Sequence, residues 1–303
     1  MSHHVPDNFG GILKPFSEYK NAAIAILPVP FDKTSTWGKG ADKGPAALIA
    51  ASQNVELYDI ETDSEVYRRG ICTDKPVRAA TPDALVKATR QRALSLLADG
   101  KFIVALGGEH SIAIGVIQAQ ADKFRSLSVL HLDAHSDRRD RYEGSRFNHA
   151  CVMARAQELT GGNVVSVGIR SLDRAEKTNI DPRRMFYAHQ IRNSRDWIAR
   201  ALKQLTDEVY VSLDLDVFDS GIMPSTGTPE PGGLDWYQVN DLLREVCACK
   251  NVVGCDVVEL CPSPHNKAPD FLAARLVFKI LSYKFRQPKN FSPPRHKGHE
   301  GLE

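Results

Sequence analysis

The sequence has no Cys-x-x-Cys pair, no apolar run near the roughly 18 residues that a bilayer-spanning helix needs, and no strong net charge. Its six cysteines are scattered through 303 residues, which argues against a thiolate zinc site and favours a reducing compartment. A formal net charge of +2 gives no basic face for nucleic acid. The first residues lack the charged and apolar regions of a signal peptide. These absences predict a cytoplasmic protein without a nucleic-acid or membrane partner.

Short apolar runs alternate with longer helical patterns along most of the chain. The runs are apolar on both faces, as strands buried in a parallel sheet are. Their alternation with helices indicates a mostly parallel sheet with helices on both sides. The expected strands are 22–27, 102–106, 127–132, 164–168, 185–188, 209–213 and 252–258, and the expected helices lie near 82–98, 112–124, 196–206, 235–248 and 268–285.

No internal repeat and no long linker divides the sequence. We therefore expect a single domain over residues 1–303, with irregular termini at 1–20 and 286–303. The C-terminal stretch is rich in proline, lysine and histidine, which is typical of a frayed or partner-facing end. Cys247 and Cys249 are expected to be ordinary thiols at the end of a helix.

Histidines and carboxylates follow the ends of several expected strands. Ligands bind at the carboxyl ends of strands in open α/β sheets, so these side chains are expected to meet at one edge. Paired glycines before the first histidine let the backbone turn sharply out of its strand. The residues are His110 after 102–106, then Asp133, His135 and Asp137 after 127–132, then Asp214 and Asp216 after 209–213, and Glu259 after 252–258.

The combination of these residues predicts a metal site, although each alone could be a loop or turn residue. Asp133, His135 and Asp137 alternate, and alternate residues of an extended chain share a face. Buried carboxylates repel one another unless a cation or proton neutralises them. Oxygen ligands with two imidazoles favour manganese or a similar divalent ion, and two such ions can share a hydroxide. His149 is a candidate proton shuttle because an unperturbed histidine titrates near physiological pH, although it could equally be a core or surface residue.

These motifs together resemble the ureohydrolase family of arginases and agmatinases over roughly residues 22–285, and the agmatinase branch is the most similar. The histidine segment of prokaryotic agmatinase-like members resembles Asn148–Met153. The other segments that carry the resemblance are Pro28–Thr36, Lys43–Pro45, Gly107–Ser111, Asp133–Asp137, Ser212–Asp216, Thr226–Gly233 and Asp256–Glu259.

The resemblance implies a three-layer α/β/α fold, a dimanganese centre and a homotrimer or homohexamer. A bridging hydroxide would attack the guanidinium carbon of agmatine and release urea and putrescine. Asp137 would take a proton from that hydroxide, Glu259 would orient the guanidinium, and His149 would help to protonate the departing amine. The implied ligands are His110, Asp133, Asp137 and Asp214 for one metal, and Asp133, His135, Asp214 and Asp216 for the other.

The substrate is less well defined by the sequence. The arginase pattern for the α-carboxylate of the amino acid is missing from Asp137–Phe147, so free arginine is disfavoured. Agmatine carries a second cation, for which Glu230 is the candidate partner, although a solvated loop glutamate is the simpler interpretation. The arginines of the loop Arg138–Arg146 would suit an anionic tail, as in guanidinobutyrate, if they point inward. If they point outward, they are solvated or pair across subunits.

Other interpretations stay open. The chain could be a ureohydrolase for another guanidino compound, such as guanidinobutyrate or guanidine. A deacetylase-like relative of the same fold would keep one metal, but the presence of both His110 and His135 argues for two. A non-catalytic assembly module would be expected to have lost at least one ligand, whereas all six are present.

Overall fold

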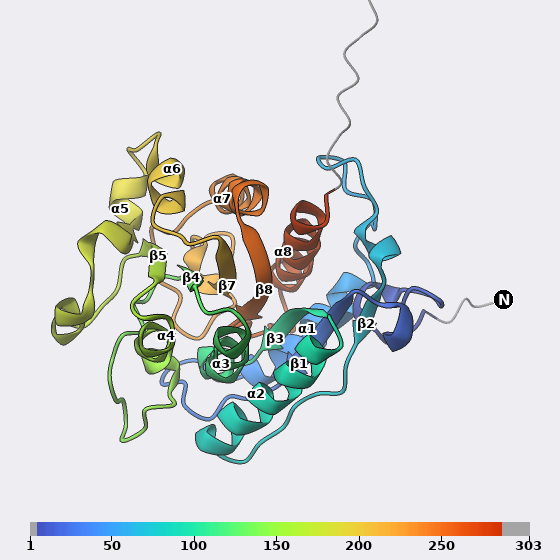
Figure 1. Cartoon of the computed structure of the whole chain (residues 1–303), viewed down its shortest axis with the longest axis horizontal. Helices are drawn as coiled ribbons and strands as arrows, with labels where there is room; N and C mark the ends of the chain where they lie inside the picture. Colours follow the sequence, from blue (N-terminus) through green and yellow to red (C-terminus); the bar gives the residue numbers. More distant parts are fainter. Residues whose placement is uncertain (1–4, 287–303) are drawn as a thin grey trace, which may run out of the picture.

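The computed structural model describes residues 5–286, in which the strands form a single eight-stranded sheet (Figure 1). The strands are β1 (Ile24–Val29), β2 (Ile71–Thr73), β3 (Phe102–Gly107), β4 (Leu127–Leu132), β5 (Val164–Ile169), β6 (Met185–Tyr187), β7 (Glu208–Asp214) and β8 (Asn251–Val258). Their order across the sheet is β2-β1-β3-β8-β7-β4-β5-β6, and all neighbouring pairs are parallel. Strand β2 was not predicted, because its 3 residues are too few to show an apolar pattern.

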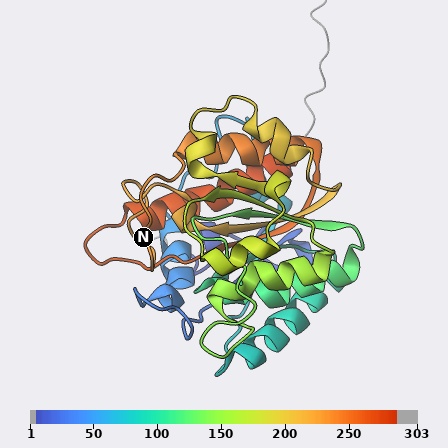
Figure 2. The same ribbon diagram turned by 90° about the vertical axis from the view of Figure 1, so that its left-hand side faces the viewer.

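Helices cover both faces of the sheet, which confirms the expected three-layer α/β/α fold. One face packs against α2, α3 and α4, and the other packs against α1, α7 and α8, with α5 and α6 beyond them. Figure 2 shows the sheet between these two layers. The helices are α1 (Gly44–Ser52), α2 (Pro82–Ala98), α3 (Ala113–Lys123), α4 (Val152–Thr160), α5 (Ala188–Ile191), α6 (Trp197–Leu202), α7 (Trp236–Cys249) and α8 (Ala268–Lys284).

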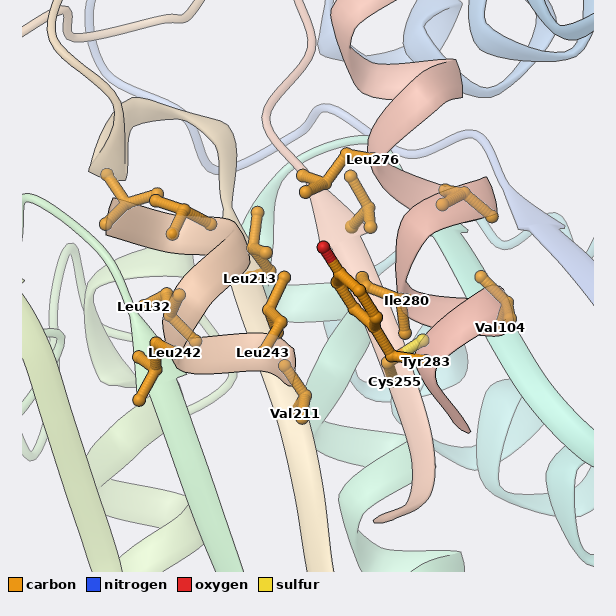
Figure 3. Packing of buried hydrophobic residues seen from close by; sticks show 14 of the residues in the cluster. Val104, Leu132, Val211, Leu213, Leu242, Leu243, Cys255, Leu276, Ile280 and Tyr283 are labelled. Atoms are coloured by element: carbon orange, nitrogen blue, oxygen red, sulfur yellow. The ribbon is translucent and has the colours of Figure 1, made fainter. Parts of the chain in front are cut away.

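The core between the sheet and α7 and α8 explains why the strand sequences are apolar without alternation. Val211 and Leu213 of β7 and Cys255 of β8 point toward Leu243 of α7 and Ile280 of α8 (Figure 3). Residues of the same strands that face the other way, such as Tyr210, are buried under the α2–α4 layer. Burial on both faces therefore requires apolar side chains at successive positions.

The strand order brings four of the strands that carry predicted site residues next to one another. Strands β3, β8, β7 and β4 are consecutive across the middle of the sheet, although they are far apart in the sequence. Because all strands are parallel, their carboxyl ends lie at one edge. The loops after these strands therefore meet there, as expected for a ligand site in an open α/β sheet.

The remaining differences from the prediction concern short elements and the ends of the chain. Helices α1 and α4 were not predicted, because each has 9 residues, less than three turns of periodic pattern. Cys247 and Cys249 lie in the last turn of α7, and all six cysteines are free. The described part of the irregular N-terminal stretch is packed, with Phe9 buried against Phe278 at a ring-centroid distance of 4.8 Å.

The expected irregular C-terminal stretch lies outside the described residues, apart from Arg286. Within residues 5–286, no helix combines the length and the apolar character that crossing a bilayer requires.

Candidate metal centre and active-site cavity

The first group of candidate ligands surrounds the ring of His110, which follows β3. His110 Nδ1 lies 3.2 Å from Asp133 Oδ2, 3.1 Å from Asp137 Oδ2 and 3.6 Å from Asp214 Oδ2. All four side chains are buried. His110 Nε2 lies 2.9 Å from Ser212 Oγ, which fixes the ring so that Nδ1 faces the carboxylates. These are the four residues that the sequence resemblance assigned to one metal.

The second group surrounds His135 and shares Asp133 with the first. His135 Nδ1 lies 2.9 Å from Asp216 Oδ2 and 3.6 Å from Asp133 Oδ1. The two oxygens of Asp133 therefore face different imidazoles, as a bridging carboxylate requires. Asp214 accepts a hydrogen bond from the backbone N–H of Asp216 at 2.9 Å, which holds the two aspartates of the β7 end together.

The electrostatics of the cluster favour a bound cation. Burial, together with the neighbouring Asp133 carboxylate, raises the pKa of Asp137 to about 6. Burial and the nearby Asp216 carboxylate raise the pKa of Asp214 well above its usual value. Such shifts mean that carboxylates this close cannot all stay ionised without positive charge between them. A divalent ion would supply that charge and displace the protons.

The donor set also fits a divalent ion on geometric grounds. His110 Nδ1 is a buried polar atom without a hydrogen-bond partner among residues 5–286, although three carboxylates surround it. Ligand atoms lie within 4.8 Å of one another inside each of two groups, and Asp133 belongs to both groups. Oxygen and imidazole donors suit manganese and similar ions better than soft metals. The residues present therefore fit a pair of divalent cations.

His131, a buried residue inside β4, was not predicted from the sequence as part of the site. Its Nε2 lies 2.7 Å from Asp133 Oδ2, and its Nδ1 lies 3.0 Å from Ser166 Oγ of β5. Both ring nitrogens are thus engaged, so His131 orients Asp133 rather than offering a free metal ligand. The only signal in the sequence was a histidine within a buried strand, two residues before an aspartate, and that position is also typical of a satisfied core residue.

Asp137 and Glu259 both have left-handed backbone conformations, with φ values of 51° and 67°. Such values are costly for residues other than glycine and persist only where the surroundings enforce them. The carbonyl of Asp137 accepts hydrogen bonds from the N–H groups of Met153 and Ala154, at the start of α4. The N–H of Glu259 donates to Gly108, and its Oε1 accepts from the N–H of His110 at 2.7 Å. Both carboxylates are therefore aimed by their backbones into the site.

His149 lines the same cavity as the candidate metal ligands, and its role as a proton shuttle stays a prediction. Burial, followed by the positive His110 and His135, lowers its pKa to about 4. Its Nδ1 lies 3.2 Å from Thr34 Oγ1, which donates a hydrogen bond to Glu109. Because the single hydroxyl proton of Thr34 is directed to Glu109, Nδ1 of His149 carries the proton of the neutral ring. Its Nε2 therefore carries a lone pair at neutral pH.

One cavity of about 310 Å³ connects most of the predicted site residues. Glu230 is not among its lining residues, but its Oε1 lies 3.8 Å from Nε2 of His135. This places Glu230 beside a candidate metal ligand and leaves its predicted contact with a substrate amine a prediction. The lining includes His110, His135, Asp137, His149, Asp214, Asp216 and Glu259.

The arginines after Asp137 point in different directions, which answers the question that the sequence left open. Arg138 is buried and donates to Ser136 and Ser166, away from the cavity. Arg141 is exposed, and Arg146 pairs with Glu158 and Asp140 on the outside of the loop. Arg139 alone of the four lines the cavity. A cluster of inward-pointing arginines for an anionic tail is therefore not formed.

A parallel α/β/α sheet with a cluster of histidines and aspartates at its carboxyl edge defines a class of α/β enzyme with a metal-binding active site. Comparison with known proteins agrees with this class, because a model of the arginase family matches residues 22–282. The chain belongs to the arginase family. It is a ureohydrolase of the agmatinase type, a hydrolase that acts on amidino C–N bonds.

Three similar proteins show how far the match extends. The chain is 37% identical to the N(1)-aminopropylagmatine ureohydrolase of Synechocystis, over 92% of this chain and 97% of that protein. It is 33% identical to the agmatinase of Pyrococcus horikoshii, over 90% of this chain and 95% of that protein. The crystal structure of the agmatine ureohydrolase of Thermoplasma volcanium superimposes with a TM-score of 0.81 at 29% identity, covering 88% of this chain and 91% of that one.

Proposed function

We propose that this protein hydrolyses the guanidinium group of agmatine, releasing urea and putrescine, with a pair of manganese ions as cofactor. The observation that carries the proposal is the shared cavity, which places Glu259 and His149 beside both candidate metal groups. A second candidate substrate is N(1)-aminopropylagmatine, which a 37% identical relative is named for. Both substrates have the same guanidinium and a cationic tail. We also propose a homotrimer or homohexamer as the working assembly.

The candidate ligands would hold the ions in two groups that share Asp133 and Asp214. His110, Asp137 and Asp214 would complete one group, and His135, Asp214 and Asp216 the other. When bound, two divalent ions would lower the pKa of a shared water and stabilise the negative charge that develops during attack.

Two carboxylates of the chain would position the reaction. Glu259 is held by the N–H of His110 through Oε1, and it lines the cavity. Burial and the neighbouring Glu109 raise its pKa, and a guanidinium beside it would favour the ionised form that pairs with the substrate. A carboxylate suits this role because it accepts two parallel N–H groups. Asp137 also lines the cavity. Its carboxylate would accept a proton from the attacking hydroxide.

His149 would pass a proton to the departing amine. Its neutral ring, with the proton on Nδ1 and a lone pair on Nε2, can accept a proton from the attacked centre and return it to the leaving nitrogen. It would act as a relay that takes up a proton and passes it on during the reaction.

Replacing His149 with asparagine tests this relay. We expect kcat to fall about 100-fold or more while KM changes little, because proton transfer typically contributes a factor of 10² or more. The measurement is steady-state urea release from the manganese-loaded protein. The matched control is His189→Asn, which changes an exposed histidine outside this cavity. An unchanged kcat in His149→Asn would remove His149 from the mechanism.

A panel of guanidines tests the proposed substrate. Purified, manganese-loaded protein is mixed separately with agmatine, N(1)-aminopropylagmatine, arginine, 4-guanidinobutyrate and guanidine, and urea is measured. We expect turnover of the two substrates with cationic tails and little from the others, because Arg139 alone of the four loop arginines lines the cavity and Asp173 lines it too. Turnover of 4-guanidinobutyrate alone would contradict the substrate proposal. Absence of urea from every compound, with metal shown to be bound, would contradict the proposed activity itself.

A further inference from the structure

We propose that Arg139 sets the substrate preference of the cavity by occupying the carboxylate of Asp173, which the cationic tail of a substrate must take over. This inference rests on the proposed function, which it deepens. Arg139 pairs with Asp173 in the structure, and the tail would displace it on binding. Arg139 is a specificity residue in this account and takes no part in the chemistry.

The position of Asp173 places it on the route of the substrate tail. Ser171, two residues before it, pairs with His135 as an isolated parallel bridge beyond the end of β5. The N–H groups of Arg170 and Ser171 also donate to the carbonyl of Ala134, at 2.8 and 3.0 Å. The segment of Asp173 therefore lies directly beside the candidate metal ligands. Asp173 and Arg139 line the same cavity as Glu259, so the tail of a guanidine held there passes along them.

The two oxygens of Asp173 have different partners. Oδ1 accepts a hydrogen bond from the N–H of Ala175 at 2.8 Å, which fixes the carboxylate in place. Oδ2 lies 3.2 Å from Nη2 of Arg139. The Ala175 hydrogen bond, and after it the charge of Arg139, lower the pKa of Asp173, so the group is ionised at neutral pH. An ammonium group that binds Oδ2 of Asp173 therefore competes with Arg139 for that oxygen.

Arg139 can give up Asp173 at small cost. The two side chains are 36% and 39% exposed, and ion pairs in contact with water are weak. The guanidinium also lies 4.8 Å from the centre of the Tyr142 ring, a cation–π contact that does not involve Asp173. Its backbone N–H is fixed to the carbonyl of Ala150 at 3.1 Å, so the side chain can move while the loop stays in place.

The neighbouring carboxylate does not compete for this role. Glu176 is buried, and its two oxygens accept from the N–H groups of Arg138 and Asp173 at 2.8 and 2.6 Å. Its charge is therefore already matched by backbone donors. Asp173, unlike Glu176, is paired with a side chain that can move away. That side chain is Arg139.

The test compares four variants by steady-state urea release from manganese-loaded protein. The variants are Arg139→Gln, Arg139→Lys, Asp173→Asn and the double variant Arg139→Gln/Asp173→Asn. The substrates are agmatine for the cationic tail, 4-guanidinobutyrate for the anionic tail and butylguanidine for the neutral tail. The matched control is Arg141→Gln, which removes an exposed arginine from the same loop, where it contacts only the carbonyl of Gly144 at 3.5 Å among the hydrogen bonds of the described residues.

Removing the charge of Arg139 should strengthen the binding of substrates with cationic tails. In Arg139→Gln we expect KM for agmatine to fall about threefold to tenfold with kcat nearly unchanged, since the lost interaction is a partly exposed ion pair. Arg139→Lys should stay near the wild type, because it keeps the charge. Asp173→Asn should raise KM for agmatine, because it removes the carboxylate that binds the tail. In the double variant, Arg139→Gln should have little further effect, because there is no longer a carboxylate for which Arg139 and the tail compete. Butylguanidine should be insensitive to all of these changes.

The result that would overturn the proposal is an Arg139→Gln variant whose KM for agmatine is unchanged or higher, or one in which butylguanidine changes as much as agmatine. Isothermal titration calorimetry with agmatine and the unloaded protein gives a readout that does not need turnover. There the affinity of Arg139→Gln should exceed that of the wild type by the same factor, and equal affinities would contradict the inference. Failure of the proposed function looks different, since the wild type would then release no urea from any substrate.

Discussion

Asp133→Asn is expected to reduce urea release by about 10³-fold or more and to lower the bound metal below two ions per chain. Asp133 belongs to both candidate ligand groups. Its Oδ2 faces His110 and its Oδ1 faces His135, at 3.2 and 3.6 Å. Asparagine keeps the volume of the side chain but has no charge and a single oxygen. Each ion would then lose the charged Asp133 ligand that it shares with the other ion.

The measurement combines metal analysis of the dialysed protein with its rate of urea release. Asp207→Asn is the matched control, because Asp207 is 95% exposed and directly precedes β7, at the opposite end of the strand from Asp214. Circular dichroism of both variants separates loss of the site from loss of the fold. Full activity in Asp133→Asn, or loss of metal without loss of activity, would contradict the two-metal account.

Glu259→Gln is expected to lower kcat about 10²- to 10³-fold while the bound metal stays at the wild-type level. Glutamine can still accept the hydrogen bond from the N–H of His110, so the neighbouring metal ligand stays in place. It cannot offer a negative charge to the guanidinium, and losing a buried charged partner costs about 2–5 kcal/mol. The loss should therefore appear in turnover and not in metal content.

The rate of urea release and the metal content of the same sample are measured together for this variant. Glu245→Gln serves as control, because Glu245 is 44% exposed on α7. If Glu259→Gln bound metal poorly, Glu259 would support the ligands rather than the substrate. A wild-type kcat would exclude it from both roles.

The sequence was sufficient to predict the residues at the strand ends, because each follows an apolar run that is buried on both faces. It also predicted the fold class and the family, and both are confirmed. The order of the strands could not be derived from the residues alone. Strand β8 lies between β3 and β7, and no local pattern specifies which buried parallel strand pairs with which.

Features that depend on the surroundings of a side chain were beyond the sequence. His131 has the position of an ordinary core residue, and only its contacts with Asp133 and Ser166 give it a role in the site. The lowered pKa of His149 results from burial and from two histidines that are close in space but distant in the sequence. The outward and inward directions of the arginines after Asp137 depend on partners such as Glu158 and Asp173, which belong to other segments.

The central claim is that the cluster at the carboxyl edge binds two divalent ions and that hydrolysis of a guanidine depends on both. The most direct test is a titration of Mn²⁺ into chelator-treated protein in which bound metal and urea release from agmatine are followed together. We expect binding to saturate at two ions per chain, with urea release reaching its maximum only as the second site fills. Full urea release from metal-free protein, or saturation at a single ion with full activity, would contradict the account.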